Sequence, residues 1–142
     1  MSERTLGIAS ALAIWGTIAA TVVFRHQFRG SAPLTVVGLA GVAGGIALIV
    51  AGKVGLGDAM ARWFTPSRLV TTGIYQKVQH PMYLGGALLL IGLALSLQSV
   101  IGICATVLVA WPTYWWSARE EARRLLQAFG TKYSLYRNQT WF

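Results

Sequence analysis

Four long stretches without a charged residue are the feature that most constrains how this sequence folds. They cover residues 6–24, 34–51, 82–97 and about 100–116. Because a helix rises about 1.5 Å per residue, stretches of this length span about 24–29 Å, close to the roughly 30 Å hydrocarbon core of a bilayer. We therefore predict an all-α integral membrane protein with four transmembrane helices, in one membrane domain of residues 1–142.

The composition agrees with a membrane protein. Charged residues make up 11% of the chain, compared with about 25% in soluble domains. A net charge of +8 would also suit nucleic-acid binding, but the basic residues border the apolar stretches, where anionic headgroups and topology account for them. We expect membrane lipids as partners and no nucleic acid. The only cysteine, Cys104, lies in an apolar stretch, so we predict no internal disulfide and no metal site.

Short signals in the sequence predict how the apolar helices pack. Only Gln98 and Ser99 separate the third stretch from the fourth, which predicts a tight antiparallel hairpin. Gly41 and Gly45 form a small-xxx-small pair in the second stretch, typical of closely packed membrane helices. Pro112 lies within the fourth stretch and predicts a kink there.

The polar segments predict two further helices. A short interfacial helix over 58–64 fits the long connection of residues 52–79, with Trp63 at headgroup level. After the fourth stretch, residues 119–129 continue as an amphipathic helix that Gly130 ends.

The distribution of basic residues predicts the orientation. With four crossings, ten lysines and arginines lie on the side that holds both termini and the 52–79 connection, whereas Arg25 and Arg29 lie on the other. Cytoplasmic segments carry the excess of Lys and Arg. Both termini, the C-terminal amphipathic helix and the start of the third span are therefore predicted to be cytoplasmic.

The start of the third span is where a polar, ring-bearing segment runs into an apolar helix. Pro81 suits the first position of that helix, which places His80 at its mouth, with Tyr83 on the same face. Gly85 and Gly86 leave this face open to another backbone or a ligand. Because the hairpin is tight, its two cytoplasmic ends are neighbours, so His80 and the pair Glu120–Glu121 are predicted to lie close in space.

Each of these residues also has a simple structural explanation. Glu120 and Glu121 are spaced to pair with Arg123 or Arg124 on one helix. His80 would then be a hydrogen-bonded anchor, and the tyrosines would belong to an interfacial aromatic belt.

The segment LVTTGIYxxxxHPMYLGG, followed by EE and then by FGxxYxxY near the end, resembles a known family. It is similar to the integral-membrane isoprenylcysteine carboxyl methyltransferases and their phospholipid N-methyltransferase relatives. The likeness covers residues 67–136, about half of the chain, and the first two spans carry no signature. The resemblance implies a small helical membrane bundle that binds S-adenosylmethionine on the cytosolic side, in regions 67–86 and 117–136, and releases S-adenosylhomocysteine.

The resemblance also implies individual roles. Glu121 matches the carboxylate that family members turn towards the cofactor, and Glu120 is its less certain neighbour. The acceptor would be a lipid or a prenyl-like molecule in the membrane, and Glu120, Glu121 and His80 are the nearby groups able to take a proton from it. The residues implied to line the cofactor are Leu69, Val70, Tyr75, His80, Pro81, Met82, Tyr83 and Glu121.

Two positions depart from the family pattern. The family usually has Arg before His-Pro, where this chain has Gln79. The carboxyl methyltransferase branch has a basic residue one turn before the second glutamate, where this chain has Ser117. A cation there would suit a carboxylate acceptor, so the acceptor is left open between a carboxylate, an amine, a hydroxyl and a thiol.

Three other functions compete with methyl transfer. A sterol-reductase-like enzyme shares a His-Pro-x-Tyr segment and would use NADPH. A small four-span drug exporter needs an acid within its first span, and residues 6–24 contain none. A purely structural membrane protein is the third alternative. We favour an S-adenosylmethionine-dependent membrane methyltransferase that acts at the cytosolic face.

Overall fold

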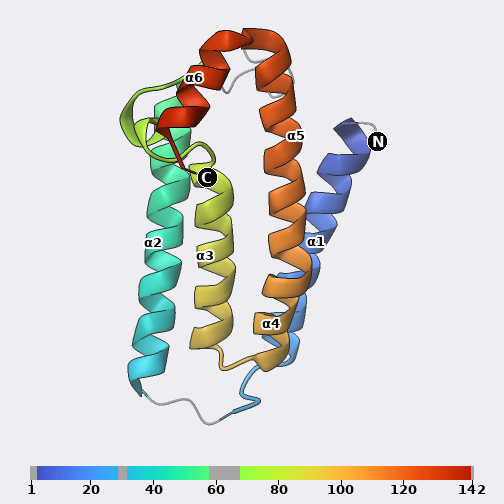
Figure 1. The fold of residues 1–142 in the computed structure, drawn as a ribbon. Coiled ribbons are helices and arrows are strands. Elements are labelled where there is room, and N and C mark those ends of the chain that lie inside the picture. The colour runs from blue at the N-terminus through green and yellow to red at the C-terminus, as the bar shows by residue number, and fades with distance from the viewer. Residues whose placement is uncertain (1–2, 29–31, 58–67, 142) are drawn as a thin grey trace.

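The computed structural model describes residues 3–28, 32–57 and 68–141, and their regular elements are all helices (Figure 1). The predicted all-α class is thus confirmed. The predicted interfacial helix over 58–64 lies outside the described residues. The elements are α1 (Glu3–Val23), α2 (Ala32–Leu56), the 3₁₀ turn η2 (Gly73–Gln76), α3 (Pro81–Ser96), α4 (Val100–Ala105), the π-helical turn η3 (Thr106–Ala110), α5 (Trp111–Phe129) and α6 (Thr131–Gln139).

Two of the four predicted spans are long and apolar enough to cross a membrane. These are α2 and the continuous helix Val100–Phe129. The apolar helices Gly7–Val23 and Pro81–Ser96 are shorter. Of the four expected spans, two therefore have the length and composition of a membrane-crossing helix. The third is short because the Gln98–Ser99 turn ends α3 after 16 residues, which is about 24 Å.

The α3–α4 hairpin forms as the sequence predicts. Gln98 adopts a positive φ of 56°, and the Ser99 hydroxyl accepts a hydrogen bond from the Gly102 N–H at 3.0 Å, capping α4. The segment after α1 docks on this turn, since the His26 N–H donates to the Leu97 carbonyl at 2.9 Å.

Glycines bring α2 and α3 into backbone contact. A methyl group added at Gly45 would lie 2.6 Å from the Gly85 carbonyl oxygen, and one at Gly92 would lie 2.6 Å from the Gly38 carbonyl oxygen. The close packing predicted from Gly41 and Gly45 is therefore confirmed. The open face at Gly85 is occupied by the backbone of α2.

Helix α2 ends at Leu56, five residues later than the predicted 34–51 span. The prediction ended it early because Gly52 and Lys53 looked like a boundary. The extra turn is packed: Gly52 faces Pro81 and Met82, and Gly55 faces the Tyr75 ring, which would lie 3.1 Å from an added methyl group. Contacts from a distant segment thus extend the helix.

The kink expected at Pro112 is accommodated by the π-helical turn η3. The Trp111 N–H donates to the Thr106 carbonyl, five residues back. Widening the helix before a proline lets the chain continue where an α-helical hydrogen bond is lost.

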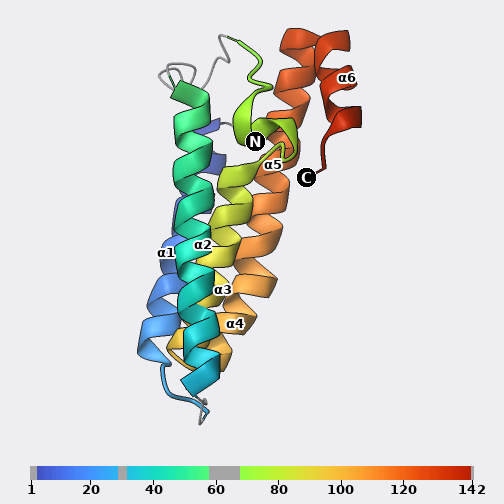
Figure 2. The same ribbon diagram turned by 90° about the vertical axis from the view of Figure 1, so that its left-hand side faces the viewer.

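Helix α5 runs on to Phe129 and α6 folds back towards η2 (Figures 1 and 2). Gly130 has a φ of 51° and donates its N–H to the Leu126 carbonyl at 2.9 Å, so it ends α5 as predicted. The Trp141 N–H then donates to the Lys77 carbonyl at 3.0 Å.

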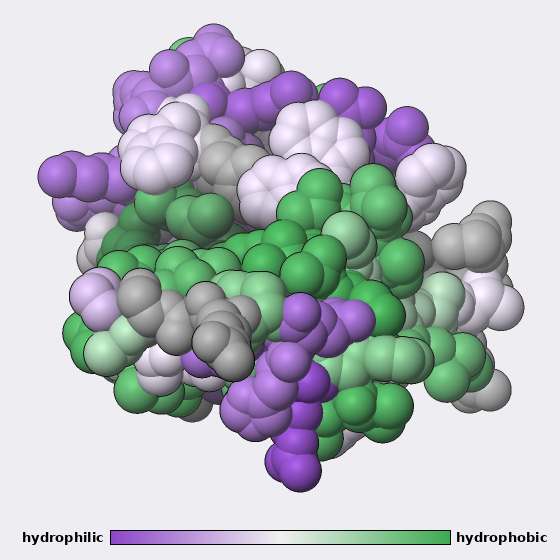
Figure 3. All heavy atoms as spheres, turned by 90° about the horizontal axis from the view of Figure 1, so that it is seen from below, coloured by the Kyte–Doolittle hydropathy of each residue, from purple (hydrophilic) through white to green (hydrophobic). Residues whose placement is uncertain are grey.

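The two ends of the bundle differ. Both chain termini and α6 lie at the end opposite the α3–α4 turn (Figures 1 and 2). The view from below shows a broad band of hydrophobic residues across the middle, with a hydrophilic group at the lower centre and further hydrophilic residues along the upper edge (Figure 3).

Candidate cofactor site

His80 and Glu121 meet at the end of the bundle that α6 covers. His80 is the N-cap residue of α3, directly before Pro81. Its Nδ1 lies 3.6 Å from Glu121 Oε2. The imidazole is 8% exposed and the Glu121 side chain 47% exposed. The proximity predicted from the tight hairpin is therefore confirmed.

Phenols from three elements surround the Glu121 carboxylate. Tyr83 on α3 lies within electrostatic reach of Glu121. Burial, and then the Glu121 charge, raises the pKa of Tyr75 in η2. Burial also raises the pKa of Tyr133 on α6, where Arg137 and Glu121 act with smaller and opposite effects. Segments that are far apart in the sequence thus converge on one carboxylate.

An aromatic wall extends from this group down α3 and α5. The His80 and Tyr83 rings lie 5.8 Å apart between centroids, and the Tyr83 and Tyr114 rings 5.9 Å. A methyl group at Gly86 would lie 2.7 Å from the Tyr114 hydroxyl oxygen. Gly86 therefore accommodates Tyr114. In the sequence nothing distinguishes Tyr114 from the neighbouring Trp115 and Trp116. Only the pairing across the hairpin places Tyr114 beside the site.

Other residues of the predicted set lie around this group. Glu120 pairs with Arg123 at 3.2 Å and with Arg124 at 3.9 Å, as its helical spacing suggested. Pro81 and Met82 pack on the α2 side, against Gly52. Leu69 and Val70 are partly buried in the segment that precedes η2.

Both positions that depart from the family pattern have partners within the fold. Gln79 accepts a hydrogen bond from the Tyr133 hydroxyl at 3.4 Å and donates to the Arg137 carbonyl at 3.5 Å. It thereby joins α6 to the His80 segment. The Ser117 hydroxyl is buried and lies 3.2 Å from the Ser10 hydroxyl of α1. Side chains on α6 and α1, distant in the sequence, thus determine the environment of these two residues.

A buried hydrogen bond fixes α6 over the site. The Tyr136 hydroxyl donates to the Tyr75 carbonyl at 2.7 Å. Burial and the neighbouring Tyr133 raise the pKa of Tyr136 to about 12. Within the described residues, no three side chains of the metal-binding types form a group. The site therefore offers a carboxylate, an imidazole and aromatic faces as its chemistry.

Comparison with known proteins places these residues in a family. The family model described as phospholipid methyltransferase matches residues 33–132, which include the whole predicted cofactor set up to Glu121. The chain is also similar to the protein-S-isoprenylcysteine O-methyltransferase of Dictyostelium discoideum, at 32% identity over 73 residues. That match covers 51% of this chain and 31% of the relative, so the chain matches less than a third of that protein. No solved structure matches the chain. With the family model covering most of its length, the chain belongs to the phospholipid methyltransferase family.

Proposed function

We propose that this chain catalyses S-adenosylmethionine-dependent methyl transfer to a lipid or prenyl-like acceptor at the cytosolic face of the membrane. The observation that carries the proposal is the position of Glu121, 3.6 Å from the buried His80 and bordered by Tyr75, Tyr83 and Tyr133. The chain belongs to the phospholipid methyltransferase family, which supports methyl transfer as the reaction.

The chemistry of this group fits the cofactor. S-adenosylmethionine supplies an electrophilic methyl group and carries a sulfonium, an ammonium and a carboxylate. Glu121 suits the ammonium or the ribose hydroxyls. The faces of Tyr75 and Tyr83 attract a cation through their π electrons. His80 and the N–H groups of the first turn of α3 suit the carboxylate or the adenine edge. Leu69, Val70, Pro81 and Met82 would complete the apolar lining.

The remaining task of these residues is alignment. Methyl transfer is an in-line displacement, so the chain accelerates it by orienting the reactants and excluding water. A site at a membrane mouth favours both and admits a lipophilic acceptor from the bilayer. An amine, hydroxyl or thiol acceptor must lose a proton, for which His80, Glu120 and Glu121 are the nearby bases.

The fold also supports the number of membrane crossings that the proposal needs. The Leu97 carbonyl binds the His26 N–H at one end, and the Lys77 carbonyl binds the Trp141 N–H at the other. If α2 crosses the membrane, the segments at residues 26 and 77 lie on opposite sides. Helix α3 then crosses as well, despite its length. We infer four crossings, and the excess of lysine and arginine on the side of the termini indicates that both termini are cytoplasmic.

The test is calorimetry of purified protein in detergent with S-adenosylhomocysteine, with NADPH as the comparison. We expect binding of the first only. His80→Ala and Tyr83→Phe should weaken that binding while melting without cofactor stays cooperative. Methyl-transfer assays over lipid classes would then identify the acceptor. Binding of NADPH alone, or variants that bind like the parent, would contradict the proposed site.

A further inference from the structure

The outer face of α6 carries exposed side chains that the methyl-transfer site does not use. Tyr133 and Tyr136 are buried against residues 75–79. Lys132, Leu135 and Gln139 are spaced by three and four residues, so they share another stripe of the helix, and all three are exposed. Leu135 is 59% exposed.

A hollow of about 320 Å³ lies between this stripe and the segment around η2. It is lined on one side by Lys132, Leu135, Tyr136, Gln139 and Thr140, which lie on α6 or at its end, and on the other side by Thr71 and Gln76. The lysine ammonium group, two side-chain amides and the threonine hydroxyls can all donate hydrogen bonds into this space, as suits a phosphodiester. Leu135 adds an apolar contact.

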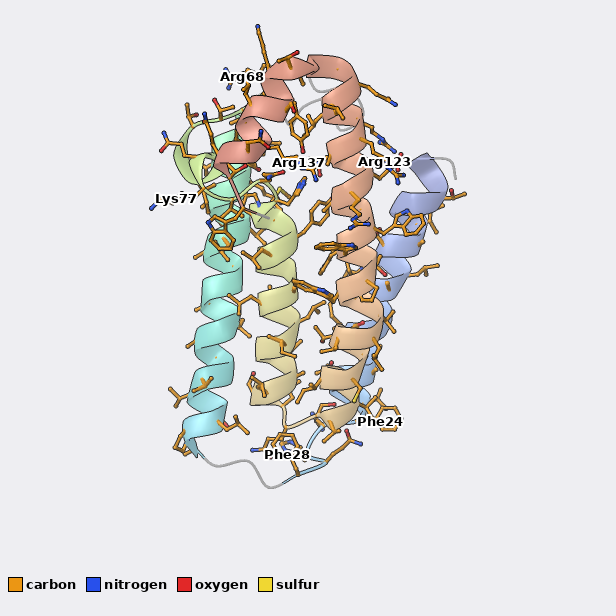
Figure 4. All side chains as sticks on the ribbon, viewed as in Figure 1. Phe24, Phe28, Arg68, Lys77, Arg123 and Arg137 are labelled. Carbon is orange, nitrogen blue, oxygen red and sulfur yellow. The ribbon has the colours of Figure 1, made fainter. Side chains whose placement is uncertain are left out.

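Further cations stand on the same side. Figure 4 shows Arg68 and Lys77 on the α2 side of α6, whereas Arg123 lies beside α5 towards α1. Within the described part of the chain, no carboxylate forms an ion pair with Arg68, Lys77 or Lys132. An uncompensated group of exposed cations attracts an anion.

The depth of this surface matches that of lipid headgroups. Lys77 precedes α3 by four residues and binds Trp141 through its carbonyl group. The 16 residues of α3 place these residues about 24 Å or more from the opposite end of the bundle, close to the thickness of the hydrocarbon core. Trp141 is 63% exposed, as suits an indole at the membrane interface.

We infer that the outer face of α6 and the facing wall of η2 bind the headgroup of an anionic phospholipid from the surrounding membrane. Lys132 and Arg68 neutralise the phosphate, Gln76 and Gln139 donate hydrogen bonds, and Leu135 contacts the glycerol and acyl carbons. The lipid is a structural ligand and is distinct from the methyl acceptor, because Tyr133 and Tyr136 separate this face from His80 and Glu121.

Native mass spectrometry of the full chain in a neutral detergent tests this inference. The protein is mixed with equal amounts of phosphatidylglycerol and phosphatidylcholine, and the ratio of the retained lipids is measured. We expect the parent to prefer phosphatidylglycerol. The double variant Arg68→Gln/Lys132→Gln should reduce this preference on the order of tenfold. The charge-keeping pair Arg68→Lys/Lys132→Arg should retain it, which also shows that the region still folds.

A matched variant separates a site from general surface charge. Arg119→Gln/Arg123→Gln removes the same charge from α5 at the same end of the bundle and should leave the preference unchanged. Equal losses in the two glutamine pairs would overturn the inference, as would no loss in either. Displacement of the lipid by inorganic phosphate would also overturn it, because the ligand would then be a free anion. No cofactor is present in this measurement, so its outcome is independent of methyl transfer.

Discussion

A substitution at Glu121 distinguishes two roles for this residue: a contact to the cofactor, or a member of a surface ion pair. The substitution Glu121→Gln keeps the shape of the side chain and removes its charge. A solvent-exposed pair is worth about 0.3–0.5 kcal/mol, whereas a charge-assisted bond to a ligand is worth roughly 1.5–3 kcal/mol. We expect Glu121→Gln to lose the larger, charge-assisted contribution, which corresponds to an affinity for S-adenosylhomocysteine about 10- to 150-fold weaker. Calorimetry measures this affinity directly.

The control for Glu121 is Arg124→Ala. Arg124 Nε lies 3.9 Å from Glu120 Oε1, so this variant removes a partner of the neighbouring glutamate and leaves Glu121 in place. Its effect on affinity should be small. Small and equal effects from both variants would assign Glu121 to the helix surface.

Tyr136 makes the stability of the fold depend on pH above about pH 10. Burial and the neighbouring Tyr133 raise the pKa of its phenol to about 12 in the fold, from an ordinary value of 10.0. The protonated phenol therefore contributes stability that is fully present below pH 10 and is lost as the pH rises through about 12. Tyr136→Phe removes the bond to the Tyr75 carbonyl and should lower the melting temperature at pH 8. Because the parent loses this contribution at high pH, the gap between parent and variant should narrow between pH 10 and 12.

Melting curves of the parent and Tyr136→Phe across pH 8–12 provide this measurement. Comparing the two proteins cancels the titration of lysines, which both share. A gap that stays constant with pH would mean that the phenol at 136 does not hold α6 over the site.

Among the elements, the packing of α2 against α3 depends on glycines at particular positions of α2. Gly45 faces the α3 backbone, whereas Gly44 does not. A methyl group at Gly45 would meet backbone atoms of Gly85 and Leu89 at 2.6 Å. One at Gly44 would meet only the Leu88 side chain, at 3.4 Å. We expect Gly45→Ala to destabilise the fold by about 1–3 kcal/mol, since it overpacks a backbone contact.

The adjacent substitution is the control for Gly45. Gly44→Ala should be neutral or slightly stabilising, because alanine favours a helix over glycine by up to about 1 kcal/mol. Thermal unfolding in one detergent compares the two variants. If both melt like the parent, α2 and α3 are not in backbone contact.

The sequence predicted what depends on local pattern. The apolar stretches gave the helices, Pro81 gave the start of α3, and the Gln98–Ser99 turn gave the proximity of His80 and Glu121. It did not predict contacts between distant segments that have no periodic signal. Helix α2 extends past Ala51 because Tyr75 packs on Gly55. Tyr114 lies beside Gly86, and Gln79 is fixed by α6.

At the scale of the whole molecule, the family match and the fold cover different parts of the chain. The match spans residues 33–132, so α1 and most of α6 lie outside it. Yet α1 reaches Ser117 through Ser10, and α6 reaches Tyr75 and Gln79. Helix α1, which carries no family signature, and α6, whose Tyr133 and Tyr136 belong to the FGxxYxxY motif, thus both contact residues of the candidate site region.

The orientation of the protein in the membrane can be tested with reporter fusions. Ten of the twelve lysines and arginines lie in the segments that the four-crossing arrangement places with both termini, and Arg25 and Arg29 lie in the connection before α2. In the structure the termini share one end of the bundle (Figure 1), as an even number of crossings requires.

Since positive charge is retained in the cytoplasm, a cytoplasm-active reporter at the C-terminus should be active. The same reporter inserted in the 25–33 connection should be silent, and an export-active reporter should give the reverse pattern. A C-terminal fusion that is active only outside the cytoplasm would refute the orientation and would place Glu121 on the side away from cytosolic cofactor. Activity of the cytoplasmic reporter at both positions would instead show that α2, α3 and the helix Val100–Phe129 do not all cross, which rules out the four-crossing arrangement.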